Sequence, residues 1–219
     1  MMKRLVMFDM DGVLFDSMPR HAKAWRQTML DEGLDFPESR IYENEGRTGK
    51  SSICLFLGVE RGEKEWPRLY ERKCRYFDAM PEAPAMPGAW DAVKAVRDFG
   101  ATAIVVTGSG QKHMLDRIDE NYGGLFRKEW MVTAADVVKG KPDPEPYLKG
   151  MERAGVPASE AVVIENAPLG VRSGHAAGCY VVAVNTGPLP DEMLLAEGAD
   201  VLYHSMKELS EHISEILDE

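Results

Sequence analysis

The sequence of 219 residues predicts an α/β fold built on a parallel sheet. Short apolar runs alternate along most of its length with segments of helical periodicity. This alternation is typical of βαβ units, in which helices cover both faces of a parallel sheet. One long stretch near the beginning contains no convincing strand and interrupts the alternation. We therefore expect a parallel-sheet core with a separate helical part inserted into it.

Five short apolar runs are the expected strands. Their lengths and composition favour strands that are buried on both faces. They cover residues 4–9, 101–106, 162–164, 180–184 and 201–203. Five helical patterns follow or separate these runs, at residues 89–98, 112–122, 144–154, 169–177 and 206–217. The first four expected strands are thus separated from one another by helices, as a parallel sheet requires.

The stretch from Ser17 to about Ala79 has aromatic, leucine and methionine residues at helical spacing but no strand pattern. Such spacing is typical of helix packing. A proline-rich connection over residues 81–88 follows, and it cannot continue a helix. We expect residues 18–81 to form a helical domain, and residues 1–17 and 82–219 to form the core. The helical domain would be able to open and close over the strand ends, because the chain crosses to it twice.

The composition limits the classes of partner. The chain has 26 basic and 36 acidic side chains, so its formal net charge is −10, which argues against nucleic acid or an anionic membrane as the main partner. No apolar run approaches the roughly 18 residues of a membrane span, and the first residues do not resemble a signal peptide. Three scattered cysteines, Cys54, Cys74 and Cys179, are typical of reduced thiols. We expect a cytoplasmic protein, and the sequence leaves its oligomeric state open, a monomer being compatible with it.

Polar residues follow the expected strands at the edge where ligands bind in open parallel sheets. They are Asp9, Asp11 and Gly12 after the first strand, Thr107, Gly108 and Ser109 after the second, and Glu165 and Asn166 after the third. A further residue, Lys141, stands just before a helix in a turn stiffened by prolines. Carboxylate and amide oxygens suit Mg²⁺. We therefore predict a magnesium site that handles a small phosphorylated substrate.

The spacing of Asp9 and Asp11 suggests a division of labour. In extended chain their side chains point to the same side, about 6.6 Å apart along the strand. One carboxylate could attack phosphorus while the other exchanges a proton with the leaving group. Mg²⁺, Lys141 and the hydroxyl of Thr107 could neutralise or hold the phosphoryl group. Gly12 would allow the chain to turn sharply. The alternative is that both aspartates belong to a solvated turn.

Four motifs, in order along the chain, resemble those of the haloacid dehalogenase superfamily of phosphotransferases. The first covers residues 9–17, the second is Thr107-Gly108-Ser109, the third is Lys141 with Pro142-Asp143-Pro144, and the fourth covers residues 165–170. The resemblance spans essentially the whole chain. The inserted helical region resembles the cap of the β-phosphoglucomutase-like branch. The resemblance implies a Rossmann-like core, an inserted all-helical cap and a covalent aspartyl-phosphate intermediate.

The resemblance also implies roles for individual residues. Asp9 would be the nucleophile and a Mg²⁺ ligand. Asp11 would be the general acid and base and would lend its backbone carbonyl to the metal. Thr107 and Lys141 would hold the phosphoryl group, with Gly108 and Ser109 beside it. Glu165 and Asn166 would hold the metal directly or through water. We expect the pKa of Asp11 to rise when the cap excludes water, because Asp11 must be protonated in the first half of the reaction.

The chain departs from the resembled pattern at two places. The fourth motif usually reads Glu-Asp, whereas Asn166 is neutral. In the sugar-phosphate mutases a cap loop resembles Lys-Gly-x-Ser-Arg, whereas here Glu45 takes the lysine position and Gly49 the arginine position. A distant phosphate of a sugar would lose its arginine partner. Our hypothesis is that Glu45 joins Asp9 and Asn166 around Mg²⁺ and shrinks the pocket, unless it is a solvated loop carboxylate.

Some members of the branch that have this asparagine and this cap glutamate resemble inorganic pyrophosphatases, so pyrophosphate is the favoured substrate. A β-phosphoglucomutase or another sugar-phosphate mutase or phosphatase is the alternative. A phosphate-binding module without catalysis is disfavoured, because both the nucleophile and the acid–base residue are present.

Four cap residues are candidates for contacts with the substrate. They are His21, Arg47, Lys50 and Lys73. His21 stands where the mutases carry a cap histidine near the acid–base aspartate, and the three cations could face an outer phosphate. The alternative for each of them is a solvated polar or charged side chain.

Overall fold

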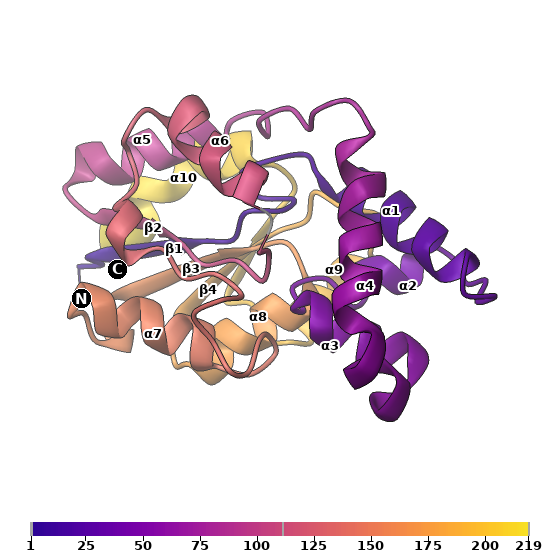
Figure 1. The fold of residues 1–219 in the computed structure, drawn as a ribbon. Coiled ribbons are helices and arrows are strands. Elements are labelled where there is room, and N and C mark those ends of the chain that lie inside the picture. Colours follow the sequence, from indigo (N-terminus) through magenta and orange to yellow (C-terminus); the bar gives the residue numbers. More distant parts are fainter. Residues whose placement is uncertain (1, 111, 219) are drawn as a thin grey trace.

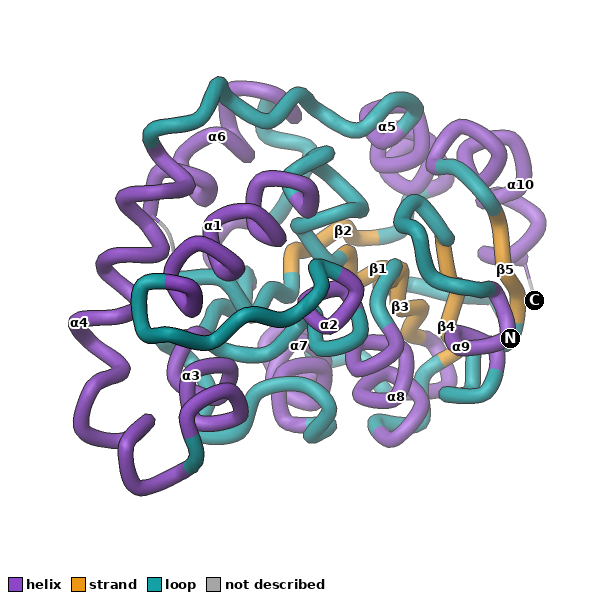
Figure 2. The backbone as a smooth tube through the Cα atoms, turned by 90° about the vertical axis from the view of Figure 1, so that its right-hand side faces the viewer, coloured by secondary structure: helices purple, strands orange, loops and turns teal. Residues whose placement is uncertain are grey.

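The computed structural model describes residues 2–110 and 112–218 and contains a five-stranded sheet. Its strands are β1 (Leu5–Phe8), β2 (Thr102–Val105), β3 (Ala161–Glu165), β4 (Tyr180–Val184) and β5 (Val201–Tyr203). They lie in the order β2-β1-β3-β4-β5, and every neighbouring pair is parallel (Figure 2). The predicted fold class is confirmed. Met1, Gln111 and Glu219, which fall within the expected core, lie outside the described residues.

Helices cover both faces of the sheet (Figure 1). On one face lie α5 (Ala89–Phe99), α6 (Lys112–Tyr122) and α10 (Met206–Asp218). On the other lie α7 (Glu145–Ala154), α8 (Pro168–Ala176) and the short α9 (Asp191–Leu195). Two single 3₁₀ turns, Lys128–Trp130 and Ala158–Glu160, complete the connections.

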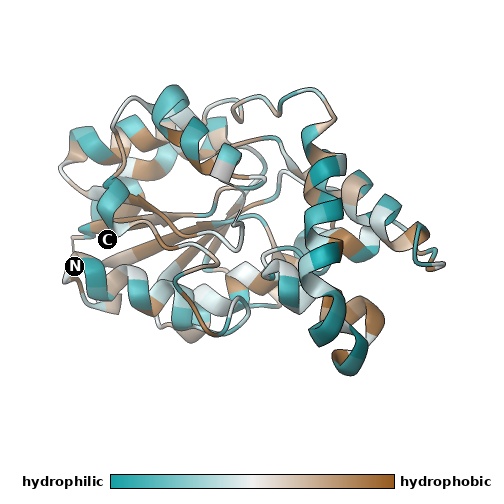
Figure 3. Ribbon diagram, viewed as in Figure 1, coloured by the Kyte–Doolittle hydropathy of each residue, from teal (hydrophilic) through white to brown (hydrophobic). Residues whose placement is uncertain are grey.

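The two apolar faces of the sheet follow the strand alternation. In β1, Val6 and Phe8 belong to the apolar cluster under α5 and α10, while Leu5 and Met7 belong to the cluster over α7 and α8. Successive side chains of a strand point to opposite faces, so a strand buried on both sides needs apolar residues at every position. The strands accordingly form a hydrophobic layer between helices whose outer faces are hydrophilic (Figure 3).

Between β1 and β2 the chain forms a helical segment with an apolar cluster of its own. It consists of α1 (Met18–Leu30), α2 (Ser39–Tyr42), α3 (Gly49–Leu57) and α4 (Val59–Asp78). Its interior is formed by residues such as Trp25, Met29, Ile53 and Leu69. The segment lies beyond the carboxyl ends of the strands (Figure 1). The chain passes between the core and this segment at two places. A hydrogen bond from the backbone N–H of Asp16 to the carbonyl of Pro84 joins them.

The turn after β1 lies close to Asn166, the residue that follows β3. Gly12 has a φ of +79°, in the left-handed region that favours glycine. A Cβ atom there would lie 2.0 Å from the amide nitrogen of Asn166, so a side chain could not be accommodated. The hydroxyl of Thr186 donates to the carbonyl of Gly12 at 2.6 Å and fixes the turn from the other side. No described helix combines the length and apolar character of a membrane span.

Candidate active site

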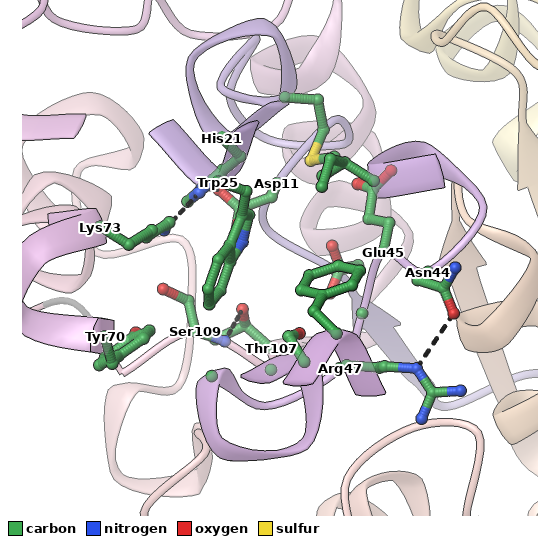
Figure 4. A pocket seen from close by; sticks show the side chains of 18 residues that line it. Asp11, His21, Trp25, Asn44, Glu45, Arg47, Tyr70, Lys73, Thr107 and Ser109 are labelled. Atoms are coloured by element: carbon green, nitrogen blue, oxygen red, sulfur yellow. Dashed lines mark hydrogen bonds and ion pairs between the residues drawn. The ribbon is translucent and has the colours of Figure 1, made fainter. Parts of the chain in front are cut away.

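A cavity of about 70 Å³ lies where the helical segment meets the carboxyl ends of β1 and β2 (Figure 4). The core contributes Asp9, Asp11, Thr107, Gly108 and Ser109 to its wall, and the helical segment contributes residues that include His21, Glu45, Arg47, Tyr70 and Lys73. Nine of the predicted site residues therefore do surround one cavity, among them residues about 100 positions apart in the sequence. Because the walls come from two parts of the chain, their relative position controls the size of the cavity.

Lys141 links the first and third strands from beneath the cavity. Its ammonium group donates to Asp9 Oδ1 and to Glu165 Oε1, each at 2.5 Å, and to the carbonyl of Val106 at 3.0 Å. The side chain of Lys141 is completely buried. Its three donors are therefore all used, and its charge is shared by two buried carboxylates. Burial alone would lower the pKa of Lys141, but Asp9 and Glu165 raise it above the usual lysine value, so the group stays charged.

Glu165 is fully engaged inside the core. Besides Lys141, the hydroxyl of Tyr147 donates to Glu165 Oε1 at 2.6 Å, and the backbone N–H groups of Asn166 and Ala167 donate to Oε2. Glu165 does not line the cavity, and direct coordination of a metal by it would break these bonds. The structure thus places Glu165 as the partner of Lys141, while its predicted role at the metal stays a prediction.

Asp9 is buried close to several other charged groups. Burial, together with the neighbouring carboxylates Glu165 and Asp11, raises its pKa to about 8 although Lys141 acts in the opposite direction. Burial likewise raises the pKa of Glu45 well above its usual value, with Asp9, Glu165 and Asp11 adding to the effect. Four carboxylates thus face two buried ammonium groups, those of Lys141 and Lys73. The site has an excess of negative charge that a cation would relieve.

Asp11 is held by a chain of hydrogen bonds that enters the helical segment. The hydroxyl of Ser17 donates to Asp11 Oδ1 at 2.5 Å, and His21 Nε2 lies 3.0 Å from the same oxygen. His21 Nδ1 in turn lies 2.7 Å from the ammonium group of Lys73 (Figure 4). Burial and Lys73 lower the pKa of His21, so its neutral ring accepts from Lys73 and donates to Asp11.

The expected rise in the pKa of Asp11 is wrong for this arrangement. Burial alone would raise it, but His21, the hydrogen bond from Ser17 and the charge of Lys73 lower the pKa of Asp11 to about 2. From the sequence we expected that water would be excluded, but not that two hydrogen-bond donors and a nearby positive charge would replace it. Asp11 is therefore ionised at rest, as a general base must be.

The loop after β2 forms the opposite wall. The hydroxyl of Thr107 accepts from the backbone N–H of Ser109 at 3.0 Å, and the backbone N–H of Thr107 donates to Val132 at 2.9 Å. A Cβ at Gly108 would lie 2.3 Å from the carbonyl oxygen of Gly46, so only glycine allows the loop to approach the helical segment this closely. These residues are where the predicted phosphate contacts would be made.

Glu45 reaches across from the helical segment to the core. The amide of Asn166 donates to Glu45 Oε1 at 2.9 Å, and both side chains are buried. The amide oxygen of Asn166 is buried and has no hydrogen-bond partner among the described residues. An unpartnered buried oxygen costs free energy unless a ligand satisfies it. Glu45 is thus not a solvated loop carboxylate, and it lies beside Asn166 as hypothesised.

The remaining cap cations are placed differently from one another. Lys73 and Arg47 line the cavity, and the Arg47 guanidinium also donates to Asn44 and Ser51, each at 3.3 Å. Lys50 is half exposed and pairs with Glu63 at 2.7 Å, away from the cavity wall. The structure does not bring Lys50 to the other candidates, because it lies on the outer side of α3 against α4.

Three residues that support the site carried no usable signal in the sequence. Ser17 holds Asp11, Tyr147 holds Glu165, and Tyr70 lines the cavity. Tyr147 and Tyr70 belong to helical patterns, in which an aromatic residue is usually interpreted as core. Ser17 ends the first motif, so its proximity to Asp11 could have been suspected.

The donor set fits a divalent cation. Among residues 2–110 and 112–218, no three His, Cys, Asp or Glu side chains form a ready-made metal cluster. The unpartnered oxygen of Asn166 and the carboxyl groups of Asp9 and Glu45, whose raised pKa values a bound cation would lower, nevertheless supply oxygen donors of the kind Mg²⁺ prefers.

Comparison with known proteins gives consistent results. Residues 3–178 match the family of haloacid dehalogenase-like hydrolases. Hexitol phosphatase A of Escherichia coli is 32% identical over 207 residues, which are 93% of this chain and 92% of that protein. Glycerol-1-phosphate phosphohydrolase 2 of Saccharomyces cerevisiae is 31% identical over 90% of this chain and 80% of that protein.

Among solved structures, a putative β-phosphoglucomutase from Bacteroides vulgatus superposes with a TM-score of 0.92 at 47% identity, covering 99% of this chain and 89% of the other. The names of these relatives favour sugar or polyol phosphates, and none of them names pyrophosphate. The match to the family model covers most of the sequence, and the predicted resemblance is confirmed. The chain therefore belongs to the haloacid dehalogenase-like hydrolases.

Proposed function

We propose that this enzyme is a phosphohydrolase that passes the phosphoryl group of a small substrate through Asp9 to water. Lys141 holds Oδ1 of Asp9, which leaves Oδ2 for phosphorus. In the first step an Asp9–phosphorus bond forms and the bond from phosphorus to the leaving oxygen breaks. In the second step water attacks phosphorus, its proton goes to Asp11, and the Asp9–phosphorus bond breaks.

The ionised state of Asp11 bears on which leaving group suits the site. An alkoxide needs a proton in order to leave, whereas phosphate leaves readily without one. With its pKa lowered to about 2, Asp11 is ionised and carries no proton that it could give to the leaving group in the first step. This difference supports a substrate whose leaving group is itself a phosphate.

Asp9, the backbone carbonyl of Asp11, the amide oxygen of Asn166 and Glu45 are the groups that would hold Mg²⁺. When bound there, Mg²⁺ would neutralise negative charge on the phosphoryl group. Thr107 and the loop through Gly108 and Ser109 would donate to the phosphoryl oxygens. Lys73 and Arg47 would face the leaving group from the cap, which we take to be residues 18–81.

Three free cysteines agree with the expected cytoplasmic setting.

Inorganic pyrophosphate is the substrate that we propose first. The observation that carries this choice is the hydrogen bond between Glu45 and Asn166, which ties the cap to the core above a cavity of only about 70 Å³. Such a cavity holds several water molecules, since one needs roughly 10–15 Å³ measured in the same way. A compact anion fits this space better than a phosphorylated hexose.

The position of Gly49 supports the same choice. A Cβ at Gly49 would lie 2.3 Å from the ring of Tyr70, so this position has no room for the arginine of the sugar-phosphate mutases. At this position the cap therefore lacks the bidentate group that would hold a second, distant phosphate in the mutases. Phosphoryl transfer between two positions of one sugar is correspondingly disfavoured.

Hydrolysis of a sugar or polyol phosphate is the second candidate, and the names of the relatives favour it. A substrate panel with measured kcat/KM separates the two. It should contain pyrophosphate, a hexitol phosphate, glycerol 1-phosphate and β-glucose 1-phosphate, each with Mg²⁺. We expect the highest value for pyrophosphate. A higher value for any sugar or polyol phosphate would overturn the substrate choice, and conversion of β-glucose 1-phosphate to glucose 6-phosphate would overturn hydrolysis itself.

A further inference from the structure

A second cavity, of about 310 Å³, has Asn166 in its wall. Its wall is formed by the turn after β1, the beginning of α1, Tyr42 of α2 and the loop after β4. Asn166 lines this second cavity and not the first, whereas its hydrogen-bond partner Glu45 lines the first and not the second. The Glu45–Asn166 pair is thus the partition between the two spaces.

The two cavities differ in charge. The first has two cationic side chains, Arg47 and Lys73, in its wall beside its carboxylates, so a cation that entered there would meet like charge. In the wall of the second, Asp16 is the one charged side chain among the described residues, and it is exposed. Burial and the nearby carboxylates of Glu45, Glu38 and Asp16 raise the pKa of Tyr42, which agrees with a negative potential there. The second cavity therefore favours a cation.

Asn166 supplies the group that such a cation would meet. Its side chain is 5% exposed, and its amide oxygen has no hydrogen-bond partner among the described residues. A Cβ at Gly12, three residues after Asp9, would lie 3.2 Å from this oxygen, and Gly12 itself lines the second cavity. The Asn166 end of the proposed cation site thus borders the second cavity.

We propose that the second cavity is the route by which the divalent cation reaches and leaves the active site. The phosphorylated substrate then enters through the first cavity when the helical segment opens, and the cation enters from the opposite side. Cations can exchange while the Glu45–Asn166 hydrogen bond stays closed. This inference rests on the cation site of the proposed function.

Gly187 offers a way to narrow the route. Its backbone is not in the left-handed region, and a Cβ there would meet the ring of Tyr42 at 3.8 Å, an ordinary contact. Gly187→Leu would place a branched side chain in the second cavity, whereas Gly187→Ala would leave most of it open. An obstacle on the route slows the association and the release of the cation by the same factor, so it leaves the dissociation constant unchanged.

The test follows Mn²⁺ binding by electron paramagnetic resonance, with stopped-flow capture of released Mn²⁺ by a chelator, in the presence of saturating inorganic phosphate. For Gly187→Leu we expect association and release to slow together by about tenfold or more, with Kd unchanged, and Gly187→Ala to behave as the unaltered protein. Equal rates in all three proteins, or a changed Kd without slower exchange, would overturn the route.

Asp16→Asn is a second and independent test. We expect slower Mn²⁺ association and a weaker dependence of that rate on ionic strength, since the exposed carboxylate attracts the cation from solution. An unchanged rate and salt dependence would contradict the proposal. If the unaltered protein binds no Mn²⁺ at all, the cation site itself is wrong, and the route falls with it. Binding of Mn²⁺ without an effect of either variant would refute the route alone.

Discussion

The core and the helical segment place their site residues by different means. In the core, Asp9 directly follows β1, Thr107 lies two residues beyond β2, and Glu165 ends β3, so backbone topology alone brings them together. In the helical segment, His21, Glu45 and Lys73 come from α1, the loop before α3, and α4. Their side chains converge only because these helices pack in one particular way.

This difference suggests a division of function between the two regions. The core holds the proposed nucleophile and its buried lysine, which any phosphoryl transfer requires. The helical segment surrounds the space in which the leaving group lies. Changes in the core are expected to abolish transfer for every substrate, whereas changes in the helical segment are expected to alter substrate choice, metal affinity or pH dependence.

The largest effect is expected for Asp9→Asn. Removal of the nucleophilic oxygen should lower kcat by about 10⁴-fold or more for all substrates. Circular dichroism and thermal unfolding should show an intact fold, because the amide is isosteric. Residual turnover within tenfold of the unaltered enzyme would show that no covalent intermediate forms on Asp9.

Lys141→Met should affect both activity and stability. The substitution leaves Asp9 and Glu165 buried without their common cation, which should cost about 3–5 kcal/mol in the free energy of unfolding. Urea denaturation measures this loss. As a matched control, Arg4→Ala removes the exposed pair with Glu160 and should cost about 0–1 kcal/mol. Similar losses for the two variants would contradict a special role for the buried network.

Glu45→Ala should weaken metal binding more than it weakens folding. We expect the Mg²⁺ concentration for half-maximal activity to rise by about 10-fold or more, and the preference for pyrophosphate over a hexitol phosphate to fall. Glu43→Ala, in an exposed neighbouring side chain, is the control and should change neither quantity. An unchanged Mg²⁺ requirement in Glu45→Ala would remove Glu45 from the metal site.

The pH dependence should report Lys73. Burial lowers the pKa of Lys73 to about 8, although Cys74 and Asp11 oppose the shift. The side chain is therefore charged below about pH 8 and loses its charge as the pH rises above it. The value of kcat/KM should fall over that range, and Lys73→Arg should move the fall to higher pH, because a guanidinium keeps its charge. A fall that is identical in the two proteins would assign the transition to another group.

The smallest effect is expected for Lys50→Ala. Lys50 and Glu63 form a half-exposed pair on the outside of the helical segment, so activity should change less than about twofold and stability by less than about 0.5 kcal/mol. The activities of Lys50→Ala and Lys73→Ala should be measured in the same steady-state assay. A comparable loss in both variants would show that Lys50 swings to the substrate after all.

The contrast between the regions also explains what could be predicted from sequence. Strands and helices of the core agree with expectation within one or two residues, because buried parallel strands and amphipathic helices have strong patterns. The short helices α2 and α9 were missed, since four or five residues show no periodicity.

In the active site, residues that follow strands were found and residues that depend on side-chain packing were not. Asp9, Asp11, Thr107 and Asn166 follow from topology, whereas Tyr147 and Tyr70 look like ordinary helix core. Lys50 and Lys73 carry the same charge in similar segments, and only the packing of α3 against α4 decides which of them faces the cavity. The low pKa of Asp11 likewise depends on two donors and one positive charge whose convergence no spacing revealed.

The most direct measurement is to quench the enzyme in acid during turnover of pyrophosphate with Mg²⁺ and to locate the phosphoryl group by mass spectrometry of the peptides. The account predicts a phosphorylated peptide that contains Asp9. The phosphate should appear on it in less than one turnover and should be lost again by hydrolysis when no further pyrophosphate is present. Phosphate found on any other side chain, or turnover with Asp9 never phosphorylated under conditions that preserve acyl phosphates, would contradict it.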